Sequence, residues 1–185
     1  MVAKTFTGGD KLQDRLNKLA KKLGQSASVE VGWAEGATYP ATGGGDPVSV
    51  ASVADIQEFG APRASIPPRP FFRPMIAKES STWGAKLNAA LGLNNCDAHK
   101  ALKLVGDDIA GALVQSIADV NSPALSPVTL MLRKMRQLDP DLVVTGKTVG
   151  EAAAKVAAGQ STSGVSTKPL VDSGTMMDNI SVMVK

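Results

Sequence analysis

Residues 53–76 read VADIQEFGAPRASIPPRPFFRPMI, and prolines crowd the second half of this stretch. Four of them fall close together: Pro67, Pro68, Pro70 and Pro74. Each proline fixes φ and removes a backbone donor, and the residue before it is pushed toward an extended conformation. The spacing therefore predicts a stiff, extended strap rather than a helix or a central strand. Two phenylalanines lie between two arginines in this strap: Arg69, Phe71, Phe72 and Arg73.

The composition is that of an ordinary globular protein, with 43% hydrophobic residues in a chain of 185. One domain over residues 1–185 is the expectation for this length. Aromatic residues make up only 4%, so the core is expected to be aliphatic. No segment approaches the roughly 18 apolar residues of a membrane span, and we expect no membrane contact.

Charge and cysteine content restrict the class of protein further. A formal net charge of +3 permits proximity to nucleic acid but does not demonstrate it. Cys96 is the only cysteine, which excludes an internal disulfide framework and suits a reducing cytoplasm. The N-terminus carries no apolar signal-peptide core.

Apolar periodicity predicts a first helix over residues 11–23, and alternation predicts a strand over 28–33. Residues 35–49 are rich in glycine and indicate a flexible loop. A short helix over 50–59 is expected to end at Gly60, immediately before the strap.

Two longer helices are expected after the strap. Pro74 suits the first turn of a helix, where its missing donor costs nothing. One face of that helix carries Ile76, Trp83, Leu87 and Leu91. Asp97 can cap the next helix. The buried side of this second helix is expected to hold Leu102, Val105, Ile109, Leu113, Ile117 and Val120.

The last third of the chain predicts two short helices, a linker and a strand. Ser126 before Pro127 indicates one helix start, and Thr148 with Glu151 indicates a capping box for another. Residues 160–168 form a Ser/Thr/Gly linker, and 180–184 alternate as a strand. Together these elements predict a helix-rich α+β fold, in which a small antiparallel sheet packs against a long helix.

Gly146-Lys147-Thr148 resembles the end of a phosphate-binding loop. The phosphate cradle needs a glycine five residues before this Gly-Lys pair, and Asp141 stands there instead. Its carboxylate would repel phosphate, so a turn followed by a helix cap is the favoured interpretation. A nucleotide-dependent enzyme remains one alternative.

Other chemistry-bearing side chains are too few to form a recognisable site. Cys96 and His99 are two ligands, short of the four of structural zinc. Asp107 and Asp108 are helix neighbours, whose side chains diverge too far for paired acid and base work. We therefore expect no catalytic residue, no metal and no cofactor.

Basic residues occur in local groups, such as Arg133, Lys134 and Arg136. Aromatic interleaving for base stacking is missing from the sequence, and no helix-turn-helix or zinc-finger spacing is present. A sequence-independent DNA-binding module is the second alternative.

The C-terminal segment from Lys168 combines a rigid entry with a tight turn. Asp172 can bond amides just downstream of itself, and Gly174 supplies a permissive φ. A helical turn then leads to the final strand, which includes Ile180 and Val182. An edge strand at this position can pair with another subunit.

Three ordered elements of the chain resemble the signature of tailed-bacteriophage tail-completion and virion-morphogenesis proteins. The family elements "EFG … IPxRPF", "LSPxTxxxR" and "PLxDTG … SI" correspond to residues 54–74, 122–133 and 169–182. Ser173 replaces the usual threonine, and Gln57 stands where the family often has histidine. An Ala/Gly-rich insert at 141–167, expected to be flexible, is longer than the family pattern.

The resemblance implies a non-enzymatic structural protein of the virion, made in the host cytoplasm and located at the head–tail junction. It implies self-association into a six-fold or twelve-fold ring that completes the tail and joins it to the head. Neck or connector proteins and the tail tube or terminator are the implied neighbours. Basic side chains lining the ring would contact genomic DNA through phosphates. A tail terminator is the alternative role within the same family.

Eight residues are candidates for subunit or partner contacts: Arg69, Phe71, Phe72, Arg73, Asp172, Gly174, Ile180 and Val182. The stiffness of the strap favours docking because little conformational entropy is lost. The alternative for Phe71 and Phe72 is a place in the hydrophobic core.

Overall fold

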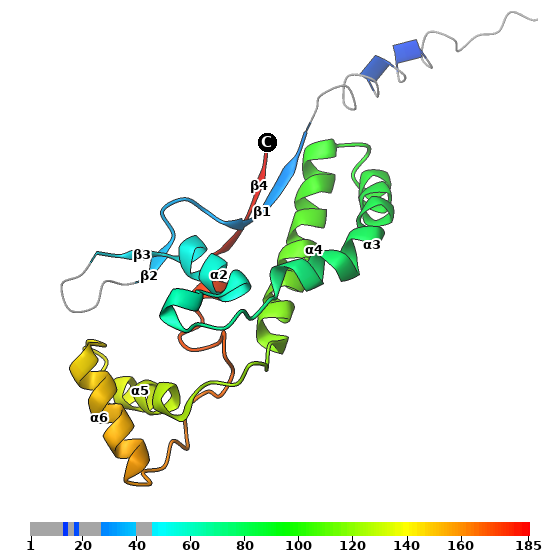
Figure 1. Cartoon of the computed structure of the whole chain (residues 1–185). Helices are drawn as coiled ribbons and strands as arrows, with labels where there is room; N and C mark the ends of the chain where they lie inside the picture. Colours follow the sequence, from blue (N-terminus) through cyan, green and yellow to red (C-terminus); the bar gives the residue numbers. More distant parts are fainter. Residues whose placement is uncertain (1–12, 15–16, 19–26, 40–45) are drawn as a thin grey trace, which may run out of the picture. The chain divides into compact units, whose positions relative to one another are not determined.

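The computed structural model describes residues 13–14, 17–18, 27–39 and 46–185 (Figure 1). The predicted first helix over 11–23 lies outside the described residues, except for residues 13–14 and 17–18, which are helical. The middle of the predicted loop, residues 40–45, also lies outside them.

The described elements follow one another in the order β1, β2, β3, α2, η1, α3, α4, α5, α6, α7 and β4. The strands are β1 (Val29–Trp33), β2 (Thr38–Tyr39), β3 (Val48–Ser49) and β4 (Ile180–Val184). The helices are α2 (Val50–Phe59), η1 (Pro62–Ala64), α3 (Phe72–Leu93), α4 (Ala98–Asp119), α5 (Pro127–Leu138), α6 (Gly146–Ala157) and α7 (Thr175–Asp178).

The α+β class predicted from the sequence is confirmed, because helices dominate and short antiparallel strands accompany them. Ser28 and Lys185 exchange backbone hydrogen bonds in both directions, at 3.0 and 2.9 Å, which is the pattern of an antiparallel pair beside β1 and β4. A second ladder pairs β2 with β3. Residues 35–49 were expected to form only a loop, and that expectation is wrong at its ends, where Thr38 faces Ser49 and Tyr39 faces Val48.

Local capping signals placed several helix boundaries correctly. The helix α2 covers Val50–Phe59 and ends at Gly60, whose φ of 76° a residue with a side chain adopts rarely. The Ser126 hydroxyl accepts from the Thr129 amide and caps α5. Asp97 accepts from the Lys100 amide at 3.1 Å and caps α4.

Two predicted boundaries are wrong. The extended strap ends at Phe71, because Phe72 and Arg73 already belong to the first turn of α3, in which Pro74 lies as predicted. The capping box of α6 joins Thr145 to Thr148, not Thr148 to Glu151. Thr145 precedes the first helical residue, so its hydroxyl reaches the third-residue amide that a cap must satisfy.

Two compact units share the chain, and neither is continuous in sequence. The first contains residues 79–109 and 182–185 with the described part of 1–31, and the second contains residues 32–78 and 110–181 with the gap already stated. The organisation of residues 1–185 as one domain stays a prediction.

In the first unit, α3 packs against α4, and the sheet of β1 and β4 packs on α4 as well. Ala90 of α3 packs with Ala101 and Val105 of α4 in a buried cluster. The β1–β4 ladder lies on α4 at Gly106, where an added Cβ would meet the side chain of Val182 and, at 2.7 Å, that of Val29. The predicted packing of a small sheet against a long helix is therefore present, and a glycine makes the close approach possible.

We expect Gly106→Ala to lower the free energy of unfolding by about 1–3 kcal/mol, because the new methyl group overpacks the contact with two stiff valines. The control is Gly111→Ala in the same helix, where a Cβ would meet nothing within 4 Å. That change is expected to stabilise by about 0.5–1 kcal/mol through helix propensity. Urea denaturation of both variants measures the two effects, and stabilisation by Gly106→Ala would contradict the packing described.

The second unit contains α2, the strap and the α5–α6 pair. Met131 and Met135 of α5 pack against Ala152 of α6 in a separate buried cluster. The helix α6 therefore gives a packed element to the 141–167 insert, whose path the sequence did not indicate. Leu113 and Ile117 of α4 are fully buried, as predicted.

Candidate functional site

The strap is held against the end of α2 by a short return of the chain. Ala61 and Ile66 form an antiparallel bridge around η1, and Arg69 donates its backbone N–H to the Gln57 carbonyl at 2.7 Å. A Cβ at Gly60 would lie 2.8 Å from Pro68 N and 2.9 Å from Ile66 O. Only glycine fits between α2 and the strap at this point.

Glu58 of α2 caps the N-terminus of α3 from a different element. Its carboxylate accepts backbone N–H groups from Phe71 at 2.7 Å, Phe72 at 2.9 Å and Arg73 at 3.2 Å. The side chain of Arg73 adds an ion pair at 2.8 Å. Glu58 is only 4% exposed, so one buried carboxylate satisfies donors that no local cap residue serves.

These contacts set the ionisation of Glu58. Burial by itself raises the pKa of the carboxyl, but the hydrogen bonds from Arg73 and from three backbone N–H groups outweigh it and hold the pKa below its ordinary value. The negative charge also lies at the positive end of the α3 dipole. Glu58 therefore remains ionised near neutral pH and joins the strap to α2.

Phe71 lies in the core of the second unit, at 1% exposure, which is the alternative role considered for it above. Its ring meets Trp33 edge-to-face at a centroid distance of 6.0 Å, and Phe72 completes the aromatic group at 6.5 Å from Phe71. The Ser116 hydroxyl donates to the Phe71 carbonyl at 2.6 Å, and Trp33 Nε1 donates to the Met176 carbonyl at 2.7 Å. The strap is thus fixed to α4 and to β1.

Arg69 is also buried, at 7% exposure. Its Nε donates to the Pro123 carbonyl at 3.0 Å, and its Nη1 donates to Gln57 Oε1 at 3.3 Å. Both partners are neutral, and burial lowers the pKa of the guanidinium. Arg69 therefore joins the strap to the segment that leads into α5.

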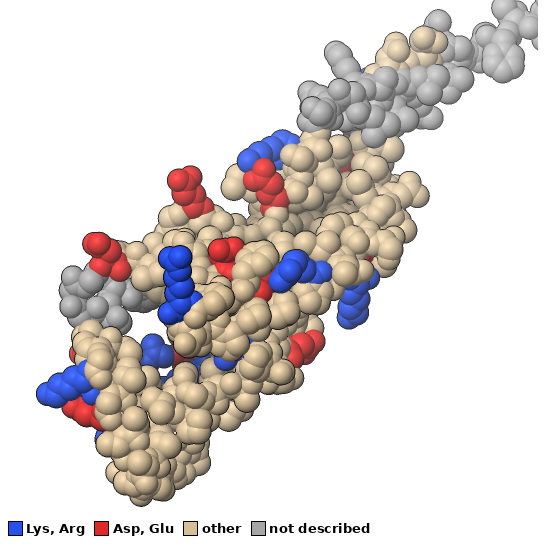
Figure 2. All heavy atoms as spheres, in the orientation of Figure 1, with Lys and Arg blue, Asp and Glu red and all other residues tan. Residues whose placement is uncertain are grey.

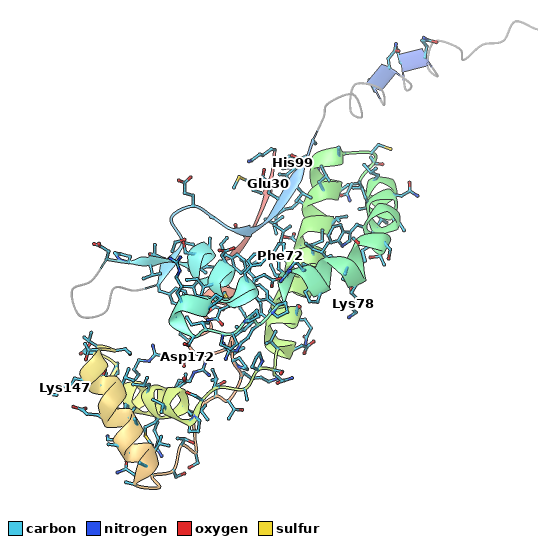
Figure 3. The ribbon with its side chains drawn as sticks, in the orientation of Figure 1. Glu30, Phe72, Lys78, His99, Lys147 and Asp172 are labelled. Carbon is cyan, nitrogen blue, oxygen red and sulfur yellow. The ribbon has the colours of Figure 1, made fainter. Side chains whose placement is uncertain are left out.

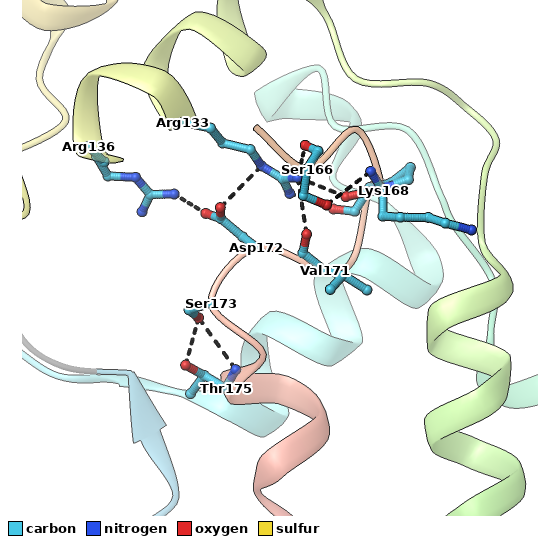
Figure 4. A network of polar contacts seen from close by, with 9 residues as sticks. Arg133, Arg136, Ser166, Lys168, Val171, Asp172, Ser173 and Thr175 are labelled. Atoms are coloured by element: carbon cyan, nitrogen blue, oxygen red, sulfur yellow. Dashed lines mark hydrogen bonds and ion pairs between the residues drawn. The ribbon is translucent and has the colours of Figure 1, made fainter. Parts of the chain in front are cut away.

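Arg133 of α5 organises the segment that precedes α7 (Figure 4). Its Nη1 donates to the carbonyls of Ser166 at 2.7 Å, Lys168 at 2.8 Å and Val171 at 3.2 Å. Its Nη2 donates to the Pro169 carbonyl at 3.2 Å. The residue is 8% exposed, so a single guanidinium supplies the donors for carbonyls that belong to no strand or helix.

The sequence suggested that Asp172 accepts hydrogen bonds from the amides just downstream of it, and that prediction is wrong. Its carboxylate pairs with Arg133 Nε at 3.4 Å and with Arg136 Nη2. The Ser173 hydroxyl accepts from the Thr175 amide instead, at 3.4 Å. The expected permissive φ at Gly174 is present, at 83°, and the expected helical turn is α7.

Next to the strap, Phe59 of α2 and Arg73 of α3 form an exposed guanidinium–aromatic pair. The Phe59 side chain is 57% exposed, and the Arg73 guanidinium lies 4.7 Å from the centre of its ring. A mainly apolar cavity of about 230 Å³ opens beside them, bounded by Trp33, Ala54 and Phe72 among others.

The eight predicted contact residues fall into different environments. Arg69 and Phe71 are buried, whereas Phe72 is half-buried and Arg73 is exposed. Ile180 and Val182 are half-buried in β4, which in the described part of the chain pairs only with β1. The role of these residues in partner contacts stays a prediction. Sequence reasoning did not select Glu58 or Arg133 as site residues, although both fall within the motifs quoted for the family.

Gly146-Lys147-Thr148 has the geometry of a capped helix start. Residues 142–145 form no strand, and the Thr148 hydroxyl donates to the Thr145 carbonyl at 2.9 Å. Figure 3 labels Lys147 on α6, and its side chain is exposed.

Neither a metal-binding cluster nor a membrane-spanning helix occurs among the described residues. No group of three or more His, Cys, Asp or Glu side chains that could hold a metal ion occurs among them. No helix within the same residues is both long and apolar enough to cross a bilayer.

Comparison with known proteins leaves the chain without a match: no family model, no curated protein and no solved structure is significantly similar to it.

Proposed function

We propose that this chain is a non-enzymatic structural protein of a tailed-phage virion, which assembles as a ring at the head–tail junction, completes the tail and joins it to the head. The proposal begins from the three motifs that resemble tail-completion and virion-morphogenesis proteins. It places the protein in the virion, next to neck or connector proteins and the tail tube or terminator. Tail termination is the alternative role.

The single observation that carries the proposal is a chain of contacts between these motifs. Glu58 of the first motif binds the end of the strap, and Arg69 of the strap binds the Pro123 carbonyl at the second motif. Arg133, which ends the second motif, binds the Pro169 and Val171 carbonyls of the third. Short motifs far apart in sequence thus form one connected structure, which supports reading them as a single signature.

The surface beside the strap suits a contact between copies. A head-to-tail ring needs two different patches on each subunit. Phe59 and Arg73 are of residue types enriched at interfaces, and they lie exposed next to a small apolar cavity. We therefore assign one of the two patches to this pair.

Deletion of the gene from the parent phage tests the role. Negative-stain microscopy of the lysate is expected to show full heads apart from finished tails, and a plasmid copy of the gene is expected to restore joined virions. Tails of irregular length would indicate the terminator role instead. Normal virions from the deletion strain would overturn the proposal.

The same complementation locates the patch. Phe59→Ser is expected to fold normally but to lower the phage titre by about tenfold or more, since an interface aromatic residue contributes roughly 2 kcal/mol. The control is Leu138→Ser, which removes another exposed apolar side chain, 79% exposed, and is expected to complement fully. Equal titres from both variants would exclude Phe59 from the interface.

A further inference from the structure

A second cavity, of about 510 Å³, lies within the second unit and is lined by the strap, by α5 and by the segment before α7. Three arginines line it: Arg69, Arg133 and Arg136. Figure 2 shows basic side chains inside a hollow between α2 and α5 on this face. The cavity shares no lining residue with the apolar one beside Phe59, and the proposed contact between copies does not involve it.

The charges that face this cavity do not balance. Asp172 is the only carboxylate among its lining residues, and in the described part of the chain it is the only carboxylate paired with any of the three arginines. Arg69 has only neutral partners, the Pro123 carbonyl and the Gln57 amide. Three guanidinium groups against one carboxylate leave an excess of two positive charges.

Burial makes this excess costly. Arg69 is 7% exposed and has no carboxylate partner among the described residues, whereas Arg133, 8% exposed, shares Asp172 with Arg136. Taking a charge without an opposite charge out of water is unfavourable by several kcal/mol. Burial lowers the pKa of Arg133, the Asp172 carboxylate opposes that change, and the charges of Arg136 and Arg69 add to it. An incoming anion would supply the missing opposite charge to the buried guanidinium groups and reduce the repulsion between the three arginines.

The walls of the cavity indicate which anion fits. Apolar side chains line part of it together with the arginines: Ile66, Pro67, Leu125, Leu132, Val144 and Pro169. Uncharged polar side chains line the rest: Gln57, Ser65, Ser126 and Thr129. A strongly hydrated phosphate backbone gains nothing from the apolar part of these walls, and a duplex is too wide for a cavity of this volume. An acidic side chain flanked by apolar residues matches both the charge and the walls. Asp172 already shows how a carboxylate binds Arg136 here.

We propose that this cavity binds an acidic peptide segment of a partner protein, with a glutamate or aspartate carboxylate paired to the arginines and apolar neighbours against the walls. Arg136 is the accessible arginine, since 41% of its side chain is exposed, and it makes the first contact. The inference rests on the charge and shape of the cavity alone, so it holds or fails independently of the virion role.

Isothermal titration of the full chain at low salt tests the site with three probes. The first is an acetylated, amidated Leu-Glu-Glu-Leu peptide, the second is its Leu-Gln-Gln-Leu counterpart, and the third is inorganic phosphate. The glutamate peptide is expected to bind at least about tenfold more tightly than the glutamine peptide, which is the minimum for one lost charge-assisted hydrogen bond. Equal binding of the two peptides, or no binding of either, would overturn the proposal. Tighter binding of phosphate than of the glutamate peptide would also overturn it.

Two variants with the same change of net charge locate the interaction. Arg136→Gln is expected to lower the affinity of the protein for the glutamate peptide by about tenfold. Lys147→Gln removes an exposed charge that does not line the cavity and is expected to leave the affinity unchanged. Equal losses from both variants would mean that the peptide responds only to overall charge, and the cavity would be excluded. Circular dichroism of both variants confirms that they are folded before titration.

Discussion

Arg133→Met is expected to lower the free energy of unfolding by about 3–5 kcal/mol, the range found when one member of a buried charged network is removed. Methionine fills the space of the arginine stem but donates no hydrogen bond. The carbonyls of Ser166, Lys168, Pro169 and Val171 then lose the hydrogen bonds that Arg133 donates. Pro169 is buried, and a buried group left unsatisfied costs about 1–3 kcal/mol. Such a loss is a large part of the roughly 5–15 kcal/mol that stabilises a typical domain.

Urea denaturation measures this change, and Arg136→Met is the matched control. Both residues lie on α5 and pair with Asp172, but the Arg136 side chain is 41% exposed. Its loss is expected to cost less than about 1 kcal/mol, as for other exposed ion pairs. Similar losses from the two variants would show that the carbonyl contacts of Arg133 do not stabilise the fold.

Glu58→Gln is expected to lower the free energy of unfolding at pH 7 by about 3 kcal/mol. Glutamine has the size of glutamate, but its amide is neutral and turns donor hydrogens toward a site that only donors surround. The N–H groups of Phe71 and Phe72 then lose charge-assisted bonds, and Arg73 loses its ion pair. Asp55→Asn, an exposed change on the same helix, is the control and is expected to cost under about 0.5 kcal/mol.

The pH dependence gives Glu58 a second signature. Its folded pKa lies below the ordinary value of 4.5, so its stabilising effect is complete above that pH and is lost as the pH falls through the folded pKa. Stability of the wild type is therefore expected to fall with acid below pH 4.5 more steeply than that of Glu58→Gln. Parallel acid profiles would contradict the capping role of this carboxylate.

The sequence predicted those features that depend on neighbouring residues. Ser126 before Pro127 and Gly60 after Phe59 are local signals, and the helices start and end where these signals lie. The capping box of α6 was misplaced because two threonines, Thr145 and Thr148, compete for the same role and only the backbone decides between them.

The two central side chains were missed because their partners are distant. Glu58 binds amides 13 to 15 residues away, and Arg133 binds carbonyls 33 to 38 residues away. One signal for Glu58 was present in the sequence. Neither Phe71, which precedes α3, nor Arg73, which precedes Pro74, has a side chain that accepts hydrogen bonds, so no local cap was available at either start. A helix start without a local acceptor predicts an acceptor from elsewhere in the chain.

The pairing of β1 with β4 has a consequence for how the protein is made. The contacts between them join residues about 150 positions apart, such as Ser181 with Gly32 and Lys185 with Glu30. During synthesis β1 leaves the ribosome long before its partner strand has been made. The backbone of β1 therefore has no partner strand, and its apolar side chains stay exposed, until β4 has been translated. Pairing of such high sequence separation also slows folding. Because each unit gathers segments from several parts of the chain, neither can be produced by cutting the gene at one point, and a ribosome stalled before β4 releases a chain whose first unit lacks its sheet.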